Sequence, residues 1–287
     1  MSGRIWSGRA VAVVVCAAVF AGGCSSSGGD DVAESGSGDT TTSAVEATTT
    51  TVATGALDIL VSNDDGYDAP GIDAVVEALR ALPDTNVTVV APAENQSGTG
   101  GNTTDGELTV TDEQTLSGYP VVAVQGFPAD AVNYGLDEVL DETPDLVVTG
   151  INAGQNIGPL TDVSGTVGAA EAAAARGIPA LASSQGLDAD PPDYPAGVDE
   201  VLAWVDEHRD AILAGDAPVQ VDNLNIPSCA TGELRGQVEV PVATDDGGRA
   251  VNDVDCTSTA EDPVDDIAGF TTGFATLSVI EVGAAAG

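Results

Sequence analysis

Short apolar runs alternate with amphipathic segments along residues 57–226, and most of the apolar runs stop at polar, glycine- or proline-rich stretches. Branched apolar runs of this length predict buried strands, and apolar positions at helical spacing predict helices between them. Two shorter strands flank a Ser-Gly turn. The expected strands are 57–61, 87–91, 107–112, 121–124, 145–149, 178–183 and 221–226, and the expected helices are 72–82, 128–143, 164–176 and 195–213.

This alternation predicts an α/β fold with a Rossmann-like, doubly wound, mainly parallel sheet. The pattern changes after about residue 222, where strands are expected only at 237–242 and 273–282, separated by an acidic, loop-rich stretch. We therefore expect a β-rich C-terminal extension over about residues 222–287, which could serve contacts between subunits.

Three polar loops, at residues 62–71, 92–104 and 150–164, each follow the carboxyl end of an expected strand. In open α/β sheets, ligands bind at this edge, where the carboxyl ends of parallel strands meet. We therefore expect the three loops to converge on one site.

The first of these loops carries two adjacent carboxylates, Asp64 and Asp65. Neighbouring acids in a tight loop repel each other unless a cation lies between them, which favours a site for a hard divalent metal ion. The alternative is a solvated turn, in which a short polar side chain binds its own backbone. For a bare Asp-Asp pair, this alternative is the more frequent one.

The N-terminus has the features of an export signal. Residues 1–24 contain Arg4 and Arg9, then the apolar stretch 10–20, then Ala21-Gly22-Gly23-Cys24, which resembles the lipobox of bacterial lipoproteins. We expect Cys24 to be lipidated and the protein to be exported and anchored to the outer face of the cell membrane. A simple cleaved signal or a membrane anchor are the alternatives. Residues 25–56 are rich in Ser, Thr and Gly and predict a disordered tether, which leaves 57–287 as the folded domain.

The charge balance is extremely acidic, with 46 Asp and Glu residues against 7 arginines and no lysine. Nucleic-acid polymers require basic faces and are therefore not expected partners. The absence of lysine excludes a P-loop lysine and a Schiff base. A bound phosphate would have to be neutralised by a metal ion, by backbone N–H groups or by one of the few arginines.

Two cysteines, Cys229 and Cys256, remain outside the N-terminal segment, and in an exported protein they most simply form a disulfide. Zinc is disfavoured because His208 is the only histidine. We expect His208 on an exposed helix face, which argues against a Ser-His-Asp triad. The acidic clusters at 137–142 and 261–266 are expected on the solvated surface.

Several motifs occur in order along residues 57–227. They are Ser62-Asn63-Asp64-Asp65-Gly66 with Ala69-Pro70-Gly71, Ala91-Pro92 with Gln96-Ser97-Gly98, Gly126 with Pro128-Ala129-Asp130, Gly150-Ile151-Asn152-Ala153-Gly154 with Asn156 and Gly158, Ser164-Gly165-Thr166-Val167, Gly177-Ile178-Pro179-Ala180 and Asn223–Pro227. Any single motif is weak, but the ordered set is specific: it resembles one protein family, the SurE survival proteins. SurE proteins are metal-dependent 5′/3′-nucleotidases, that is, nucleoside monophosphate phosphatases.

The resemblance implies a set of site residues. It places the metal ligands at Asp64, Asp65, Ser97 and Asn152, and the phosphate-binding residues at Asn156, Ser164, Gly165 and Thr166. Carboxylate, hydroxyl and amide oxygens form a hard ligand set that suits one Mg²⁺, Mn²⁺ or Ca²⁺ ion. Asp64 and Asp65 are the expected catalytic residues, and the nucleophile is either a water molecule, which we favour, or Asp64 itself.

The sequence thus predicts a divalent-metal-dependent phosphomonoester hydrolase that acts on nucleoside 5′- or 3′-monophosphates outside the cytoplasm. The alternative is a surface lipoprotein that binds a nucleotide or metal ion without turnover. The family resemblance also implies, weakly, a homodimer or tetramer.

Overall fold

The computed structural model describes residues 55–189, 191–248 and 251–282. The expected signal peptide, the lipidation candidate Cys24 and nearly all of the expected tether lie outside the described residues. The described residues belong to one compact unit. Within the described ranges, no helix is both long enough and apolar enough to cross a membrane.

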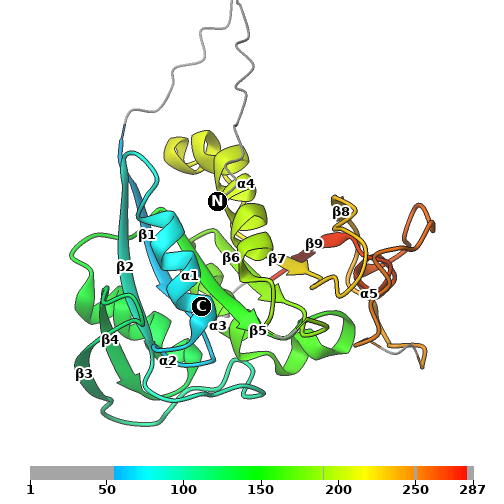
Figure 1. Cartoon of the computed structure of the whole chain (residues 1–287). Helices are drawn as coiled ribbons and strands as arrows, with labels where there is room; N and C mark the ends of the chain where they lie inside the picture. Colours follow the sequence, from blue (N-terminus) through cyan, green and yellow to red (C-terminus); the bar gives the residue numbers. More distant parts are fainter. Residues whose placement is uncertain (1–54, 190, 249–250, 283–287) are drawn as a thin grey trace, which may run out of the picture. The chain divides into compact units, whose positions relative to one another are not determined.

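A nine-stranded mixed sheet forms the centre of the domain (Figure 1), with strand order β3-β4-β2-β1-β5-β6-β7-β9-β8. All neighbouring strands are parallel except the pairs β3–β4 and β7–β9. The strands are β1 (Leu57–Ser62), β2 (Thr85–Pro92), β3 (Thr109–Gln114), β4 (Pro120–Gln125), β5 (Leu146–Ala153), β6 (Ala180–Gln185), β7 (Val221–Ile226), β8 (Gln237–Glu239) and β9 (Ala275–Ile280).

The strand order reverses at β1, which confirms the predicted doubly wound α/β fold. From β1 the chain moves outward through β2 to β4, returns to β5 on the other side of β1, and continues to β6 and β7. Such a reversal opens a crevice between the carboxyl ends of the two strands that flank it. The topology therefore places the preferred ligand site at the ends of β1 and β5.

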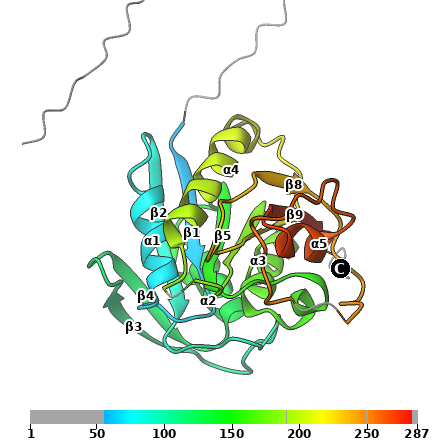
Figure 2. The ribbon, with the colours of Figure 1, turned by 45° about the vertical axis from the view of Figure 1, so that its right-hand side comes forward.

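Helices cover both faces of the sheet, as Figures 1 and 2 show. Helices α1 (Pro70–Leu79) and α4 (Tyr194–Ala214) bury their apolar sides on one face. Helices α2 (Pro128–Tyr134) and α3 (Gly165–Ala175) pack on the other. The small residues of α3 allow close packing: a Cβ at Gly168 would lie 2.5 Å from the backbone of Gly100. Any larger residue there would push the loop after β2 away from the helix.

Two segments differ from the sequence prediction near the site. The single helix expected over 128–143 is instead α2 followed by a π-helical turn, η1 (Gly135–Val139). Strand β5 was expected to end at residue 149 but continues to Ala153, with a register shift between Thr149 and Asn152 in its pairing with β6. A 3₁₀ helix, η2 (Gly158–Val163), occupies the second half of the expected loop.

The C-terminal extension is less β-rich than expected. Its strands β8 and β9 extend the central sheet, and helix α5 (Asp266–Thr271), which the sequence analysis did not predict, packs beside them (Figure 2). The expected solvated surface at 261–266 is wrong for Asp266, whose side chain is fully buried. Asp266 accepts hydrogen bonds from the N–H groups of Gly158, Ala243 and Ile267, and these bonds stabilise the buried carboxylate. The predicted disulfide between Cys229 and Cys256 is present.

Candidate active site

The chain turns sharply at the carboxyl end of β1 and buries one of its two adjacent carboxylates. The Nδ2 of Asn63 donates to the carbonyl oxygen of Gly66 at 2.8 Å, which closes the turn. Gly66 has a φ of +102°, a conformation that favours glycine. Within this turn only 2% of the Asp64 side chain is exposed, and Asp65 is partly buried.

Hydrogen bonds tie this turn to the loop that follows β2. The N–H of Gln96 donates to the carbonyl oxygen of Asp64 at 2.7 Å. The Nδ2 of Asn95 donates to Oδ1 of Asp65 at 3.1 Å, and Oδ1 of Asn95 accepts from the N–H of Ser97 at 3.0 Å. Ser97 is therefore held two hydrogen bonds away from Asp65, and its side chain is exposed.

The end of β5 and the start of α3 complete the site. The N–H of Ala153 donates to Oδ2 of Asp65 at 2.8 Å. The hydroxyl of Thr166 donates to Oδ1 of Asp64 at 2.7 Å. The predicted convergence of the three loops is confirmed, because the Asp65 carboxylate of the first loop is bonded to Asn95 in the second and to Ala153 in the third.

The first turn of α3 faces the carboxylates that follow β1. The Oγ of Ser164 accepts from the N–H of Val167 at 3.1 Å and caps the helix. A Cβ at Gly165 would lie 2.7 Å from Cβ of Asp64, so glycine is needed for this approach. The first N–H groups of a helix have no acceptor within it, and the helix dipole adds positive potential there. This end of α3 is therefore suited to bind an anion.

Burial shifts the pKa values of both carboxyl groups upward. Burial raises the pKa of Asp64 to about 6, the Thr166 hydroxyl opposes this shift, and the charge of Asp65 adds to it. Burial also raises the pKa of Asp65, against the hydrogen bonds from Ala153 and Asn95. Both carboxylates lose hydration on burial, and the charge of Asp65 also repels that of Asp64. Binding of a cation between them would therefore be favourable, because it would neutralise this charge.

Asn152 provides the test of whether a metal ion fits this site. Its Nδ2 donates to the carbonyl oxygen of Gly154 at 2.6 Å, which fixes the orientation of the amide. Its Oδ1 is buried and has no hydrogen-bond partner. A buried amide oxygen without a partner is unfavourable unless a ligand contacts it, and an amide oxygen is a good ligand for a hard cation.

Across the described ranges, no group of three or more His, Cys, Asp or Glu side chains is arranged to hold a metal ion. A cation at Asp64 and Asp65 would thus also need neutral oxygen ligands, and the buried Oδ1 of Asn152 is an oxygen of this kind without a partner. The residues present fit Mg²⁺, Mn²⁺ or Ca²⁺.

Two of the expected phosphate-binding side chains are already engaged within the protein. The hydroxyl of Thr166 donates to Oδ1 of Asp64, and its backbone N–H also interacts with this carboxyl group and lowers its pKa. The Nδ2 of Asn156 donates to Oγ of Ser184 at 2.8 Å, and its second hydrogen remains for a ligand.

The four arginines that the structure describes are all occupied outside this site. Arg80 pairs with Glu77, and Arg176 pairs with Asp137. Arg209 binds Thr85 and neighbouring carbonyl oxygens, and Arg235 binds the carbonyl oxygens of Thr272 and Ala260. In the described part of the chain, a phosphate would therefore depend on backbone N–H groups and on a bound cation.

His208 takes no part in the site, as predicted, but its expected position on an exposed helix face is wrong. The ring is partly buried and stacks on Trp204, with 4.3 Å between the ring centroids. Its Nδ1 lies 2.8 Å from the carbonyl oxygen of Trp204.

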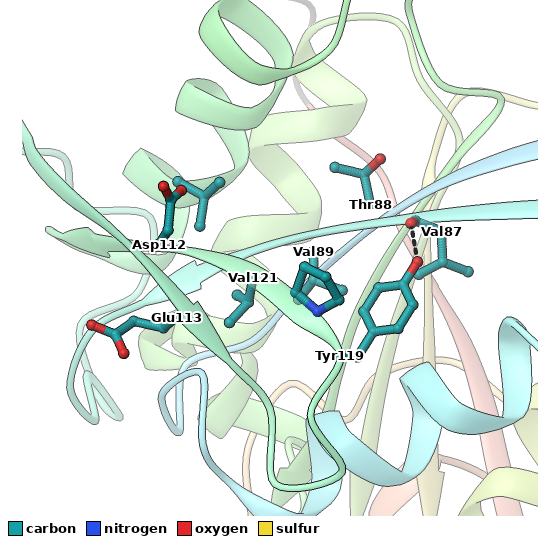
Figure 3. Close-up of a pocket in the computed structure, with 9 residues that line it drawn as sticks. Val87, Thr88, Val89, Asp112, Glu113, Tyr119 and Val121 are labelled. Atoms are coloured by element: carbon teal, nitrogen blue, oxygen red, sulfur yellow. Dashed lines mark hydrogen bonds between the residues drawn. The ribbon is translucent and has the colours of Figure 1, made fainter.

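A hollow of about 400 Å³, shown in Figure 3, also lies away from the site. Val87, Val89, Tyr119 and Val121 form its apolar wall, and the Tyr119 hydroxyl donates to the carbonyl oxygen of Val87 at 2.7 Å. These residues belong to β2, to β4 and to the turn before β4. The hollow therefore contains none of the predicted site residues.

Sequence reasoning missed Asn95 and the N–H of Ala153, which both hold Asp65. Asn95 stands inside the polar loop that was recognised, but nothing in its spacing distinguishes it from Gln96. A backbone N–H leaves no signature in a sequence. Both contacts depend on how the loops fold together.

The sequence and the fold were compared with those of known proteins. The family model described as "Survival protein SurE" matches residues 59–247. The chain belongs to the SurE family. A protein from Geobacter sulfurreducens named 5′-nucleotidase SurE is 40% identical over 194 residues, which cover 67% of this chain and 69% of that relative.

Two further SurE proteins are similar over different lengths. The 5′-nucleotidase SurE of Methanopyrus kandleri is 48% identical over 127 residues, 44% of this chain and about half (48%) of that relative. The crystal structure of the SurE protein from Aquifex aeolicus superposes with a TM-score of 0.62 at 28% identity, covering 79% of this chain and 94% of that one. The similarity of the two structures agrees with the α/β fold described above.

Proposed function

We propose that this SurE-family protein is a 5′-nucleotidase, a hydrolase that removes the phosphate of nucleoside monophosphates with the help of one divalent metal ion. One observation carries the proposal: Ala153 at the end of β5 donates its N–H to the Asp65 carboxylate, next to Asp64, and the adjacent Asn152 has a buried Oδ1 without a partner. This is the edge of the sheet where the strand order reverses, and the N-terminus of α3 lies against Asp64 there.

The chain supplies the binding groups for both the cation and the phosphate. Asp64, Asp65, Asn152 and Ser97 would hold the metal ion, and Thr166 orients Asp64. A divalent ion bound there polarises the phosphoryl group and offsets charge on its oxygens. The first N–H groups of α3 would bind the phosphate, with Ser164 and Asn156 beside them.

We propose water rather than Asp64 as the nucleophile, because the Asp64 carboxylate already accepts a hydrogen bond and would also bind the cation. Rapid acid quenching with labelled nucleotide tests this. Phosphate bound covalently to the protein would instead assign the attack to Asp64.

The direct test is phosphate release by the purified protein from nucleoside 5′- and 3′-monophosphates, with Mg²⁺, Mn²⁺, Ca²⁺ or EDTA. Asp65→Asn should lose at least about a hundredfold in rate, because it removes a charged ligand of the cation. Asp68→Asn is the matched control, since Asp68 is an exposed acid in the same loop. Nucleotide that binds and is recovered intact would favour a binding protein without turnover.

We further propose that the protein is exported and lipid-anchored through Cys24, where it would release phosphate from nucleotides outside the cell. The support is the basic, apolar and lipobox-like order of residues 1–24. Metabolic labelling with a fatty acid should mark the wild type but not Cys24→Ser. An unlabelled, soluble wild-type protein would contradict the anchor.

A further inference from the structure

Strand β7 carries two asparagines that the proposed chemistry does not use. Asn223 and Asn225 are both fully buried, and their i, i+2 spacing points both side chains to the same face of the sheet. Buried amides are unfavourable unless they are hydrogen-bonded, so their partners indicate why they are there.

Both asparagines bind the main chain of Asn156. The Oδ1 of Asn225 accepts from the N–H of Asn156 at 2.6 Å, and its Nδ2 donates to the carbonyl oxygen of Asn156 at 3.2 Å. The Nδ2 of Asn223 donates to the same carbonyl oxygen at 2.8 Å. The side chain of Asn225 thus contacts both polar main-chain groups of Asn156, as a neighbouring strand would.

Asn156 lies just beyond the point where β5 stops pairing with β6, at Ala153 and Gln185. From there the chain has no ladder of strand hydrogen bonds to fix it. The side chain of Asn156 is held separately by Oγ of Ser184 on β6. Two neighbouring strands therefore set both the backbone and the amide of Asn156.

We propose that Asn225, assisted by Asn223, is a positioning residue that sets the affinity of the site for phosphate by holding Asn156 in place. This inference rests on the proposed function, in which Asn156 contacts the phosphate. Asn225 itself touches neither the phosphate nor the metal ligands. It acts only through Asn156.

A double-mutant cycle in the full chain separates this role from a purely structural one. Asn225→Ala should raise the Kd for inorganic phosphate, measured by calorimetry with Mg²⁺, by about tenfold, because two buried hydrogen bonds are lost. The KM for a nucleoside 5′-monophosphate should rise in parallel, with kcat changed less. In an Asn156→Ala background, where no side chain remains to be positioned, Asn225→Ala should change the Kd less than about twofold.

Thr276→Val is the matched control. Thr276 pairs with Asn225 across β7 and β9, is fully buried, and its hydroxyl has no partner among the described residues. This substitution perturbs the same buried layer without touching Asn156, so the phosphate Kd should not change. Asn223→Ala is the second variant and is used if Asn225→Ala does not fold. It removes one hydrogen bond to Asn156 instead of two, so it should give a smaller rise in the phosphate Kd.

Equal effects of Asn225→Ala in both backgrounds would overturn the proposal. So would an unchanged Kd in a folded variant, or a Mg²⁺ affinity, measured without phosphate, that weakens as much as the phosphate affinity. Failure of the proposed function is distinguishable, because the wild type would then bind phosphate without releasing it from any nucleotide.

Discussion

The hydroxyl of Thr166 donates a 2.7 Å hydrogen bond to Oδ1 of Asp64 and joins two buried residues that lie 102 positions apart in the sequence. Asp64 lies in the turn that follows strand β1, and Thr166 lies in the first turn of α3. The contact fixes the orientation of the Asp64 carboxylate before any ligand binds. It also holds the N-terminus of α3 against Asp64, so the proposed cation and phosphate sites would be formed together.

Replacing Thr166 by Val should weaken metal binding. The loss of a hydrogen bond to a charged group is worth about 1.5–3 kcal/mol, so the affinity for Mg²⁺ or Mn²⁺ should fall about 10- to 100-fold. Calorimetric titration of the metal-free protein measures the change. Thr166→Ser keeps the hydroxyl and should stay close to wild type. Equal losses in the two variants would show that the methyl group, not the hydrogen bond, is what matters.

Asp64→Asn should make the metal-free protein more stable at neutral and alkaline pH. The pKa of Asp64 is raised from 3.8 to about 6 in the folded state, so the folded protein holds this proton more tightly than the unfolded chain. The resulting stability is present below pH 3.8 and is lost as the pH rises through about 6. Above that pH the buried charge lowers the free energy of unfolding by up to about 3 kcal/mol.

Urea unfolding in EDTA at two pH values checks this prediction. The variant should exceed the wild type near pH 8 and match it near pH 4, because both side chains are neutral at the lower pH. Adding Mg²⁺ should stabilise the wild type more than the variant. A variant less stable than the wild type at both pH values would show that Asp64 is well solvated without metal.

The sequence was most informative where local pattern and turn chemistry agree. The run 57–61 and the turn at Asp64 and Asp65 predicted both β1 and the position of the carboxylates. Ser164, followed by a small-residue helix, predicted the start of α3. The convergence of the loops followed from topology alone, because parallel strands bring their carboxyl ends together.

The parts that could not be predicted depend on tertiary contacts. Asp266 looked like one more surface acid, but three backbone N–H groups from separate segments satisfy its burial. The partner of the Thr166 hydroxyl is not visible in local spacing, since it lies 102 residues away. The π-helical turn at Gly135–Val139 has the same apolar spacing as the α-helix that was expected.

Moderate salt should raise kcat/KM rather than lower it. The chain has a formal net charge of −39, and the four arginines that the structure describes are occupied away from the site. The protein therefore repels a nucleotide dianion, and screening weakens this repulsion. Between about 0.05 and 0.5 M KCl at constant free Mg²⁺, kcat/KM should rise about threefold or more.

The inhibition constant of the matching uncharged nucleoside is the control for the salt series. It should stay nearly constant, because a neutral ligand does not respond to the long-range field of the protein. A monotonic fall of kcat/KM with salt would contradict the prediction and would point to a cationic side chain near the phosphate.

Removing the Cys229–Cys256 disulfide should destabilise the domain more than it damages the site. The bond closes a 27-residue separation, for which the loss of unfolded-state entropy is worth about 3.5 kcal/mol. The loop that it closes contacts the segment after β5, where Nε2 of Gln155 donates to the carbonyl oxygen of Val251 at 2.8 Å and to Oδ1 of Asn252 at 2.6 Å, but it supplies none of the proposed site residues. We therefore expect the double substitution Cys229→Ser, Cys256→Ser to lower the free energy of unfolding by about this amount, while KM changes little at low temperature.

Reducing the wild type should give the same loss, and a chain lacking residues 1–24 should show no free thiols before reduction. Two free thiols in that unreduced, denatured chain would show that the bond does not form.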